Sequence, residues 1–259
     1  MSFLKKVVLI TGASSGIGAE IAIYLAQLGA LLSITGRNKH NLEKVAEQCG
    51  QSKPFIIMAD LANENDVKNI IDLTIKHYGK LDVLINNAAI FELGSIETAS
   101  LEQYDNIFNV NIRSTFQLTA LAVPHLIKTK GNIINVSSIT GLRPFKNNLL
   151  YSMSKATLDH FTRCIALELG SRQVRVNSIN PGAVITHLFR KYGSQEQIKN
   201  FFEQSKEWHV LGRNGDVLEI VKTIAFLASD DASFITGVTL SVDGGMHIMP
   251  PAVTFASLV

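Results

Sequence analysis

The stretch that decides the fold of this 259-residue chain is VVLITGASSGIG, residues 7–18. A short apolar run, typical of a strand buried on both faces, leads through a glycine-rich turn directly into a helical pattern. Gly12 permits the tight turn, Gly16 lets a phosphate approach the backbone, and Gly18 allows close packing of the helix. The other turn positions expected to meet the phosphate are Ser14, Ser15 and Ile17. Because the first N–H groups of a helix can bind an anion, the stretch predicts a dinucleotide site.

Short apolar runs alternate with long amphipathic segments along the rest of the chain. The predicted strands are residues 7–11, 31–35, 54–59, 83–86, 133–137, 174–180 and 239–242. The predicted helices are residues 17–28, 39–49, 65–78, 101–128, 149–169 and 216–227. This alternation implies an α/β fold with a parallel sheet, right-handed crossovers and helices over it. No repeat or linker divides the pattern, so we expect one domain over residues 1–259.

Composition favours a globular protein with a sizeable core. Hydrophobic residues make up 46% of the chain and charged residues 18%, and the net charge of +2 gives no reason to expect a nucleic acid partner. No run approaches the roughly 18 apolar residues of a membrane span, and no signal peptide is recognisable. Cys49 and Cys164 are too few for a disulfide framework and fit a reducing compartment. We therefore expect a cytoplasmic protein. The histidines show no metal-ligand spacing, so no metal is expected.

The regular alternation is interrupted after Pro181-Gly182, where a long segment precedes the next predicted helix. Long excursions in compact domains are usually lids or binding segments. The large apolar side chains of this segment are Leu188, Phe189, Tyr192, Phe201, Phe202 and Trp208. We interpret residues 183–209 as a substrate lid that contains a short helix. The alternative is that these side chains pack against the core or a neighbouring subunit.

Tyr151 and Lys155 lie four residues apart at the start of the helix predicted for residues 149–169, so their side chains share one face. An ammonium beside a phenol favours the phenolate and is expected to lower the tyrosine pKa from about 10. Such a phenol can exchange a proton with an alcohol or carbonyl oxygen, to which Ser138 can donate a hydrogen bond. The alternative is an amphipathic helix that carries this pair by coincidence.

The residues after the second predicted strand, Thr35-Gly36-Arg37-Asn38, bear on the choice of dinucleotide. An acid at this place binds the ribose 2′-hydroxyl, whereas an arginine accommodates a 2′-phosphate. The sequence has no acid here, and the planar guanidinium of Arg37 suits a phosphate. NADP(H) is therefore favoured, with NAD(H) as the alternative, and we assign Arg37 and Asn38 to the cofactor site. The other interpretation of Arg37 is a surface residue near a helix start.

Asn111 falls on the apolar stripe of the helix predicted for residues 101–128. A buried amide without partners is costly. It is therefore either a satisfied core asparagine or part of a functional hydrogen-bond chain.

These motifs together resemble the short-chain dehydrogenase/reductase family over essentially the full length of the chain. Residues 11–18 resemble its cofactor turn, and Asn86-Asn87-Ala88-Ala89 resembles its NNAG motif, with Ala89 where glycine is usual. The resemblance implies that the catalytic positions are Asn111, Ser138, Tyr151 and Lys155. It implies further cofactor contacts from Asp60, Leu61, Asn87, Ala88, Tyr151, Lys155, Pro181, Gly182, Val184 and Thr186.

The family resemblance implies a doubly wound, Rossmann-like fold with a seven-stranded parallel sheet. It also implies an NADP(H)-dependent oxidoreductase that interconverts a carbonyl and a secondary alcohol by hydride transfer, with Tyr151 as general acid/base. Lys155 would also hold the ribose hydroxyls, and Asn111 would hold a water that links Lys155 to solvent. A non-catalytic NADP-binding redox sensor and an isomerase or dehydratase on a related fold are the alternatives.

Two further expectations concern the substrate and the assembly. Apolar residues near the predicted site, Phe91, Leu93, Ile139, Leu142 and Phe145, predict a small, largely apolar carbonyl or alcohol as substrate. Apolar residues beyond one stripe in the two longest predicted helices indicate a homo-oligomer, either a tetramer or a dimer. These residues are Leu118, Leu121, Val123, Phe161, Cys164 and Ile165.

Overall fold

The computed structural model describes residues 1–186, 188 and 193–249 and contains the seven-stranded sheet expected from the sequence. The strands are β1 (Val7–Thr11), β2 (Leu31–Gly36), β3 (Phe55–Met58), β4 (Val83–Asn86), β5 (Asn132–Val136), β6 (Arg175–Pro181) and β7 (Thr239–Val242). They are all parallel and lie in the order β3-β2-β1-β4-β5-β6-β7. The predicted α/β class and the doubly wound parallel sheet are confirmed.

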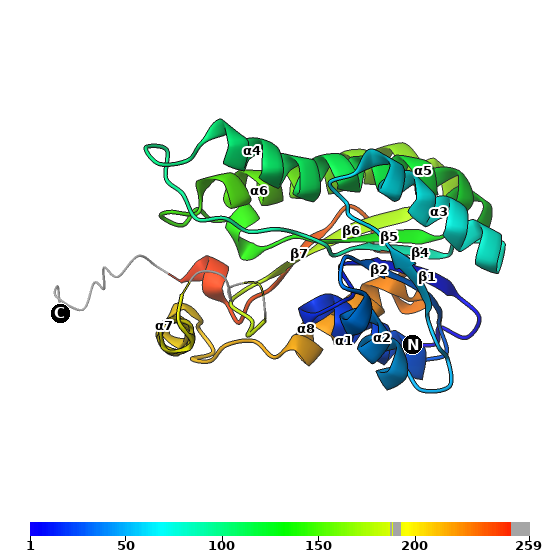
Figure 1. Ribbon diagram of the computed structural model, residues 1–259, viewed down its shortest axis with the longest axis horizontal. Helices are drawn as coiled ribbons and strands as arrows, with labels where there is room; N and C mark the ends of the chain where they lie inside the picture. Colours follow the sequence, from blue (N-terminus) through cyan, green and yellow to red (C-terminus); the bar gives the residue numbers. More distant parts are fainter. Residues whose placement is uncertain (187, 189–192, 250–259) are drawn as a thin grey trace.

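Helices cover both faces of the sheet (Figure 1). One face carries α3 (Glu64–Tyr78), α4 (Leu101–Phe108), α5 (Ser114–Thr129) and α6 (Leu149–Leu169), and the other carries α1 (Gly16–Gln27), α2 (Lys39–Gln48) and α8 (Val217–Ala228). Because successive side chains of a strand point to opposite faces of the sheet, β1 contributes side chains to the apolar core on each face. Val8 and Ile10 belong to the core beneath α1 and α8, while Val7 and Leu9 belong to the core beneath α3 and α5.

The strand order places the crevice of the sheet between β1 and β4. The chain runs from β1 outward to β3 and then crosses back to β4 on the other side of β1. Connections from β1 and β4 therefore leave the sheet in opposite directions, which opens a crevice at their carboxyl ends. The glycine turn after β1 and Asn87-Ala88 after β4 lie at this place.

The single helix predicted for residues 101–128 is interrupted in the structure. Between α4 and α5 lies the π-helical turn η1 (Asn109–Arg113), which contains Asn111. Single π turns inside α-helices are rare and are found mostly at functional sites. No helix among the described residues is long and apolar enough to cross a membrane.

The apolar residues that we expected on the surface of the two longest helices are mostly in the core. Leu118 is fully buried, and Leu121, Val123 and Ile165 pack against the core beneath α3 and α5. The prediction was wrong because a helix that packs on a sheet buries a wider apolar face than one narrow stripe. Phe116 is instead 59% exposed on α5.

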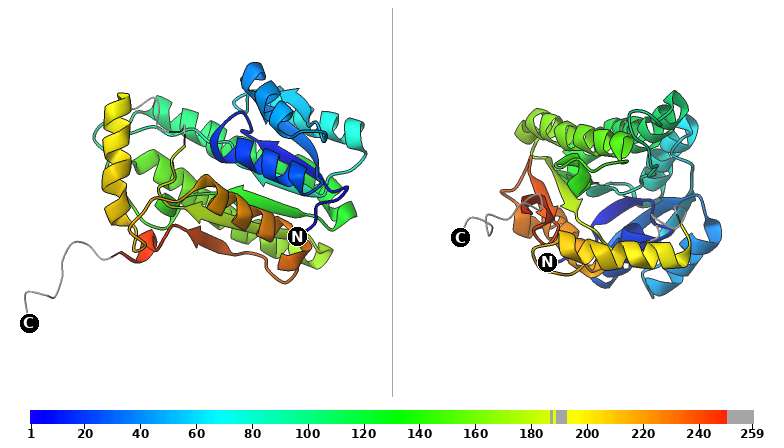
Figure 2. Two further views of the ribbon diagram at one scale, coloured as in Figure 1. Left: turned by 90° about the horizontal axis from the view of Figure 1, so that it is seen from below. Right: turned by 90° about the vertical axis from the view of Figure 1, so that its left-hand side faces the viewer.

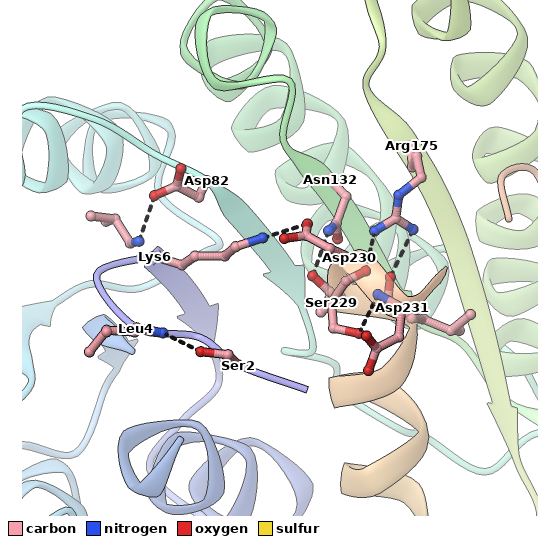
Figure 3. Close-up of polar contacts among 12 residues, drawn as sticks. Ser2, Leu4, Lys6, Asp82, Asn132, Arg175, Ser229, Asp230 and Asp231 are labelled. Carbon is pink, nitrogen blue, oxygen red and sulfur yellow. Dashed lines mark hydrogen bonds and ion pairs between the residues drawn. The ribbon is translucent and has the colours of Figure 1, made fainter. Parts of the chain in front are cut away.

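At the amino ends of the strands, side chains form hydrogen bonds and an ion pair with the end of α8 and the loop that follows it (Figure 3). Arg175 donates to the backbone carbonyl of Ile235 in this loop at 3.3 Å. It also donates to the carbonyls of Leu227 and Ser229 at the end of α8, at 2.9 and 2.8 Å, and Asn132 donates to the carbonyl of Ala228 at 2.8 Å. These bonds satisfy carbonyls that the end of α8 leaves without helical partners. Lys6 pairs with Asp230 at 2.6 Å and fastens the amino-terminal arm to the same loop.

The segment predicted as a lid contains a helix, α7 (Gln195–Ser205), which lies across one end of the sheet (Figure 2). Ser194 and Gln197 form a capping box that starts this helix. Phe202 is buried in it, while Phe201 meets Trp208 edge to face with ring centroids 5.3 Å apart. Phe189 and Tyr192, also assigned to the lid, lie outside the described residues.

Candidate active site

A cavity of about 1010 Å³ opens at the carboxyl ends of the strands. Most of the residues assigned from the sequence line it: Gly12, Ser14, Ser15, Gly16, Ile17, Arg37, Asp60, Leu61, Asn87, Ala88, Ser138, Tyr151, Lys155, Pro181, Gly182, Val184 and Thr186. Gly18, Asn38 and Asn111 do not line it. The fold thus brings the predicted cofactor and catalytic residues to one cavity, which is large enough for a dinucleotide and a small substrate.

The glycine turn is shaped by close backbone contacts that only glycine allows. Gly12 has a φ of 65°, and a Cβ there would lie 2.8 Å from the Cα of Ala88. A Cβ at Gly18 would collide with the carbonyl oxygen of Gly12. The Thr11 hydroxyl accepts from the N–H of Ala88 at 3.1 Å and ties the turn to β4. The turn is therefore rigid and leaves the start of α1 open to an anion.

The glycine turn forms one side of a cradle for the expected cofactor, and the other side comes from a distant part of the chain. Gly16 has a φ of 57°, and a Cβ at this position would lie 3.6 Å from the Cβ of Thr186. Thr186 follows β6, so the two ends of the expected cofactor site meet across the crevice. Ala89 is not among the residues with positive φ, so its substitution for the usual glycine introduces no backbone strain.

Tyr151 and Lys155 lie side by side on the first turns of α6 and are 7% and 3% exposed. The Lys155 Nζ lies 5.4 Å from the centroid of the Tyr151 ring and donates to the carbonyl of Val136 at 2.8 Å. The ring of Phe91 packs edge-on against Tyr151, with centroids 5.1 Å apart. Ser138 is hydrogen-bonded to the phenol. The predicted proximity of serine, tyrosine and lysine is therefore present.

Burial changes the pKa of both groups. It raises the pKa of the Tyr151 phenol above its ordinary value, and the hydrogen bond with Ser138 opposes this only in part. The expectation that Lys155 produces a net lowering of the Tyr151 pKa is therefore wrong, because desolvation of the phenolate outweighs the nearby charge. Burial also lowers the pKa of Lys155 to about 8, although the Asp159 carboxylate raises it in part.

Asn111 is satisfied within the protein. Its Oδ1 accepts from the N–H of Ile90 at 2.8 Å, and its Nδ2 donates to the carbonyl of Ile90 at 2.9 Å and to the Ser154 hydroxyl at 3.1 Å. The side chain thus fastens the segment after β4 to α6, next to Tyr151 and Lys155. Its part in a proton relay remains a prediction.

Arg37 is positioned to meet an anion at the edge of the cavity. Its side chain is 65% exposed, and its Nη1 lies 3.9 Å from the Oδ2 of Asp60. Exposed pairs of this kind contribute little free energy, so the guanidinium can exchange this partner for a phosphate. Asn38 has a structural role, because its Oδ1 accepts from the N–H of Asn41 at 2.9 Å and caps α2.

The remaining wall of the cavity is mainly apolar. It is formed by Phe91, Leu93, Ile139, Phe145, Leu188, Ile198, Phe201, Trp208 and Met246. Polar residues also line it, namely Glu92, Asn106, Asn109, Thr140, Lys146, Asn148 and Gln197. Leu142 is 45% exposed and does not line it. The sequence analysis missed Met246, which is brought to the cavity by Arg143: this guanidinium donates to the carbonyls of Met246 and Met249 at 2.9 and 2.8 Å.

His209 is a second residue that the sequence analysis missed. It is buried, its Nδ1 pairs with the carbonyl of Ser205 at 2.7 Å, and its Nε2 accepts from the N–H of Ala183 at 3.2 Å. These bonds require the neutral ring with its hydrogen on Nδ1. The histidine joins the end of the lid helix to the segment that follows Gly182. A single histidine outside any metal-ligand or catalytic motif carries no sequence signal for such a role.

The chain is similar to known oxidoreductases over most of its length. The sequence model of a family described as enoyl-(acyl carrier protein) reductase matches residues 12–247. The chain is 34% identical to the 3-oxoacyl-[acyl-carrier-protein] reductase of Thermotoga maritima, covering 94% of this chain and 98% of that one. It is 36% identical to the L-xylulose reductase of Caenorhabditis elegans, covering 94% and 96%.

Solved structures show the same architecture. The crystal structure of a 3-ketoacyl-(acyl-carrier-protein) reductase from Brucella melitensis complexed with NADH superposes with a TM-score of 0.88 at 32% identity. The match covers 95% of this chain and 100% of that one. Sequence and fold therefore agree over nearly the whole length.

Proposed function

The chain belongs to the short-chain dehydrogenase/reductase family, and from that premise we propose that it is an NADP(H)-dependent oxidoreductase. The proposed reaction interconverts a carbonyl and a secondary alcohol on a largely apolar substrate. The relatives named above act on alcohol or carbonyl groups. The observation that carries the proposal is the arrangement of Ser138, Tyr151 and Lys155 at one wall of the cavity, next to the glycine cradle. The nicotinamide dinucleotide, when bound, supplies or accepts the hydride.

Tyr151 and Ser138 act on the substrate oxygen. In the reductive direction the Tyr151 hydroxyl donates its proton to the carbonyl oxygen, and Ser138 donates a hydrogen bond that stabilises the developing negative charge. In the oxidative direction the same phenol, as phenolate, takes the proton of the alcohol. Burial raises the Tyr151 pKa, so the phenol is held in its proton-donating form. This favours carbonyl reduction near neutral pH.

Lys155 stabilises the phenolate that remains after the proton has left. Its Nζ lies against the Tyr151 ring, 5.4 Å from the centroid, so the charge acts through a protein interior of low dielectric constant. With a pKa of about 8 the ammonium form predominates at pH 7. The same ammonium, with hydrogens not used by Val136, can hold the ribose hydroxyls of the dinucleotide.

The residues around the cradle suit a dinucleotide. Gly12 and Gly16 hold the turn open, Asp60 lines the same cavity, and Arg37 is exposed with a weak partner. The guanidinium supports a 2′-phosphate and hence NADP(H). NAD(H) remains the alternative, and a relative of similar fold binds NADH. The free thiols of Cys49 and Cys164 fit a reducing, cytoplasmic location.

A screen of carbonyl compounds for NADPH oxidation tests the proposed activity. We expect turnover of hydrophobic ketones or acyl compounds, because the lid and the facing loop present Phe145, Phe201 and Trp208 to the substrate. Small polyhydroxylated ketones serve as the contrasting set. Turnover restricted to the polyhydroxylated set would contradict the apolar substrate, and no turnover with either nucleotide would contradict the proposed reaction.

We further propose that the protein is a homo-oligomer through α5 and α6. A groove of about 530 Å³ between these helices and α4 is lined by Phe108, Ile112, Phe116, Leu158 and Phe161. An open apolar groove beside an exposed phenylalanine is typical of a surface that is covered by a partner. Two-fold pairing of like helices would cover both copies at once, as a dimer or within a tetramer.

Light scattering at micromolar concentration should therefore give a mass of at least twice 28.3 kDa. Phe116→Glu should lower this mass, because a charge would replace the most exposed ring of the groove. Phe234→Glu is the matched control, since Phe234 is fully exposed and does not line this groove. A fully active 28.3 kDa species of the native protein would contradict the proposal.

A further inference from the structure

Asp159 is a buried carboxylate that the reaction described above does not use. It lies on α6 four residues after Lys155 and is 2% exposed. Acidic side chains are almost never buried to this extent unless they are paired. The polar groups around the Asp159 carboxylate therefore indicate what the residue does.

The carboxylate is held by side chains from the carboxyl ends of β5 and β6. Asn180 Nδ2 donates to its Oδ2 at 2.8 Å, and the Ser178 hydroxyl donates to its Oδ1 at 3.2 Å. The Ser137 hydroxyl also lies next to the carboxylate and donates to the backbone carbonyl of Lys155 at 3.2 Å. Burial raises the pKa of the Asp159 carboxyl group, and the hydrogen bonds to its charged form oppose this in part.

Asn180 connects this carboxylate to the catalytic serine. The same Nδ2 that donates to Asp159 also donates to the backbone carbonyl of Ser138 at 2.7 Å. Its Oδ1 is buried and has no hydrogen-bond partner. The orientation of this amide is therefore set by its two acceptors, and the chain Asp159–Asn180–Ser138 fixes the backbone from which the serine hydroxyl projects.

Lys155 lies one turn before Asp159 on α6, and its charge favours the ionised form of the carboxyl group. The groups that face the carboxylate from β5 and β6 are uncharged hydroxyls and an amide. From the 3-10 turn η2 (Ile139–Gly141), Gly141 packs so closely that a Cβ there would lie 2.6 Å from the Asp159 Oδ2. The lysine and the aspartate are therefore the two charges of one buried cluster, with Tyr151 as the third titratable member.

We propose that Asp159 is a positioning residue of the active site, which holds the Ser138 backbone through Asn180 and keeps Lys155 protonated by its charge. The proposal rests on the proposed function, because it assumes that Ser138 and Lys155 serve the reaction. It assigns to α6 a third residue of the site, one turn further along than the lysine. The carboxylate does not contact the substrate.

Asp159→Asn tests the proposal because it removes the charge and keeps the shape. The oxygen of the introduced amide can still accept from Asn180, and its nitrogen can donate to Ser178, so the Ser138 backbone stays in place. Without the negative charge both Lys155 and Tyr151 lose their protons more easily. The alkaline limb of the kcat/KM profile for NADPH-dependent reduction should therefore move to lower pH by about one unit.

Ser178→Ala is the matched control. It removes one hydrogen bond to Asp159 but leaves the charge, so it should leave the alkaline limb in place. Asp159→Leu removes both the charge and the acceptor of Asn180. It should show the shifted limb together with a further loss of kcat, because the Ser138 carbonyl is no longer held.

Unfolding by urea gives a second readout that needs no activity. In the native protein the pKa of Lys155 is about 8, below its ordinary value of 10.5, so the unfolded chain binds more protons and stability rises with pH between these values. In Asp159→Asn this rise begins at lower pH. The difference in urea midpoint between native protein and variant should therefore shrink from pH 7 to pH 9.5, and for Ser178→Ala it should stay constant.

The outcomes are distinguishable. An unchanged alkaline limb together with a pH-independent loss of urea midpoint in Asp159→Asn would overturn the proposal and leave a purely structural aspartate. If no carbonyl compound is reduced with either nucleotide, the proposed function fails. In that case the urea series alone decides whether Asp159 and Lys155 are coupled as we infer.

Discussion

Tyr151→Phe is expected to lower kcat by about 10²–10⁴-fold, the contribution typical of a positioned acid–base group. The substitution removes the proton donor and keeps the ring, so the edge-on contact with Phe91 and the packing of Lys155 over the ring remain. Affinity for NADP(H) should stay nearly unchanged. Steady-state kinetics with a reducible ketone, together with NADPH binding by fluorescence, measures both quantities.

Tyr104→Phe is the matched control, because Tyr104 is a partly exposed tyrosine on α4, outside the cavity. It should keep native kcat and KM. Retention by Tyr151→Phe of a tenth or more of the native kcat would remove Tyr151 from the role of general acid. A comparable loss in Tyr104→Phe would point instead to general damage from removing a tyrosine hydroxyl.

Arg37→Asp is expected to change the preference between NADPH and NADH by about 10²-fold in kcat/KM. Two charge-assisted hydrogen bonds to a 2′-phosphate are lost, each worth roughly 1.5–3 kcal/mol before solvent screening reduces it. The new carboxylate repels that phosphate and can accept from a 2′-hydroxyl. It also lies near Asp60, whose Oδ2 is 3.9 Å from the native guanidinium, so binding of both nucleotides weakens. The ratio of the two kcat/KM values isolates the phosphate effect.

Lys39→Asp makes the same change of charge two residues away, on an ammonium that is 73% exposed and pairs with Glu43. It should alter the preference far less, because it lacks the planar fork that binds phosphate bidentately. An equal effect in both variants would indicate a general electrostatic field. A native enzyme that already prefers NADH would show the argument from Arg37 to be wrong.

The helix predicted for residues 101–128 shows where sequence patterns stop being informative. Its apolar periodicity was sufficient to place a helix, and α4 and α5 are present. The π turn at Asn109–Arg113 could not be predicted, because it depends on what Asn111 contacts. Those contacts, Ile90 and Ser154, come from the segment after β4 and from α6.

The residues of the candidate site also divide into those that a local motif predicts and those that depend on contacts distant in the chain. Most of its residues could be assigned because each lies in a local motif: a glycine turn after a strand, an arginine after the next, a tyrosine and lysine one turn apart on a helix. Asp159, His209 and Arg143 could not be assigned, since none belongs to such a motif. Their importance arises from partners far away in the chain.

The amino-acid sequence by itself determined the seven parallel strands, the glycine turn, and the tyrosine and lysine on one helical face. These features depend on hydrophobic period and on backbone conformations that a few neighbouring residues impose. Only the tertiary structure decided the direction of the Tyr151 pKa, the burial of Leu118, and the link from Asp159 through Asn180 to Ser138. Desolvation and long-range hydrogen bonds are set by which segments meet in space, and local sequence does not specify that.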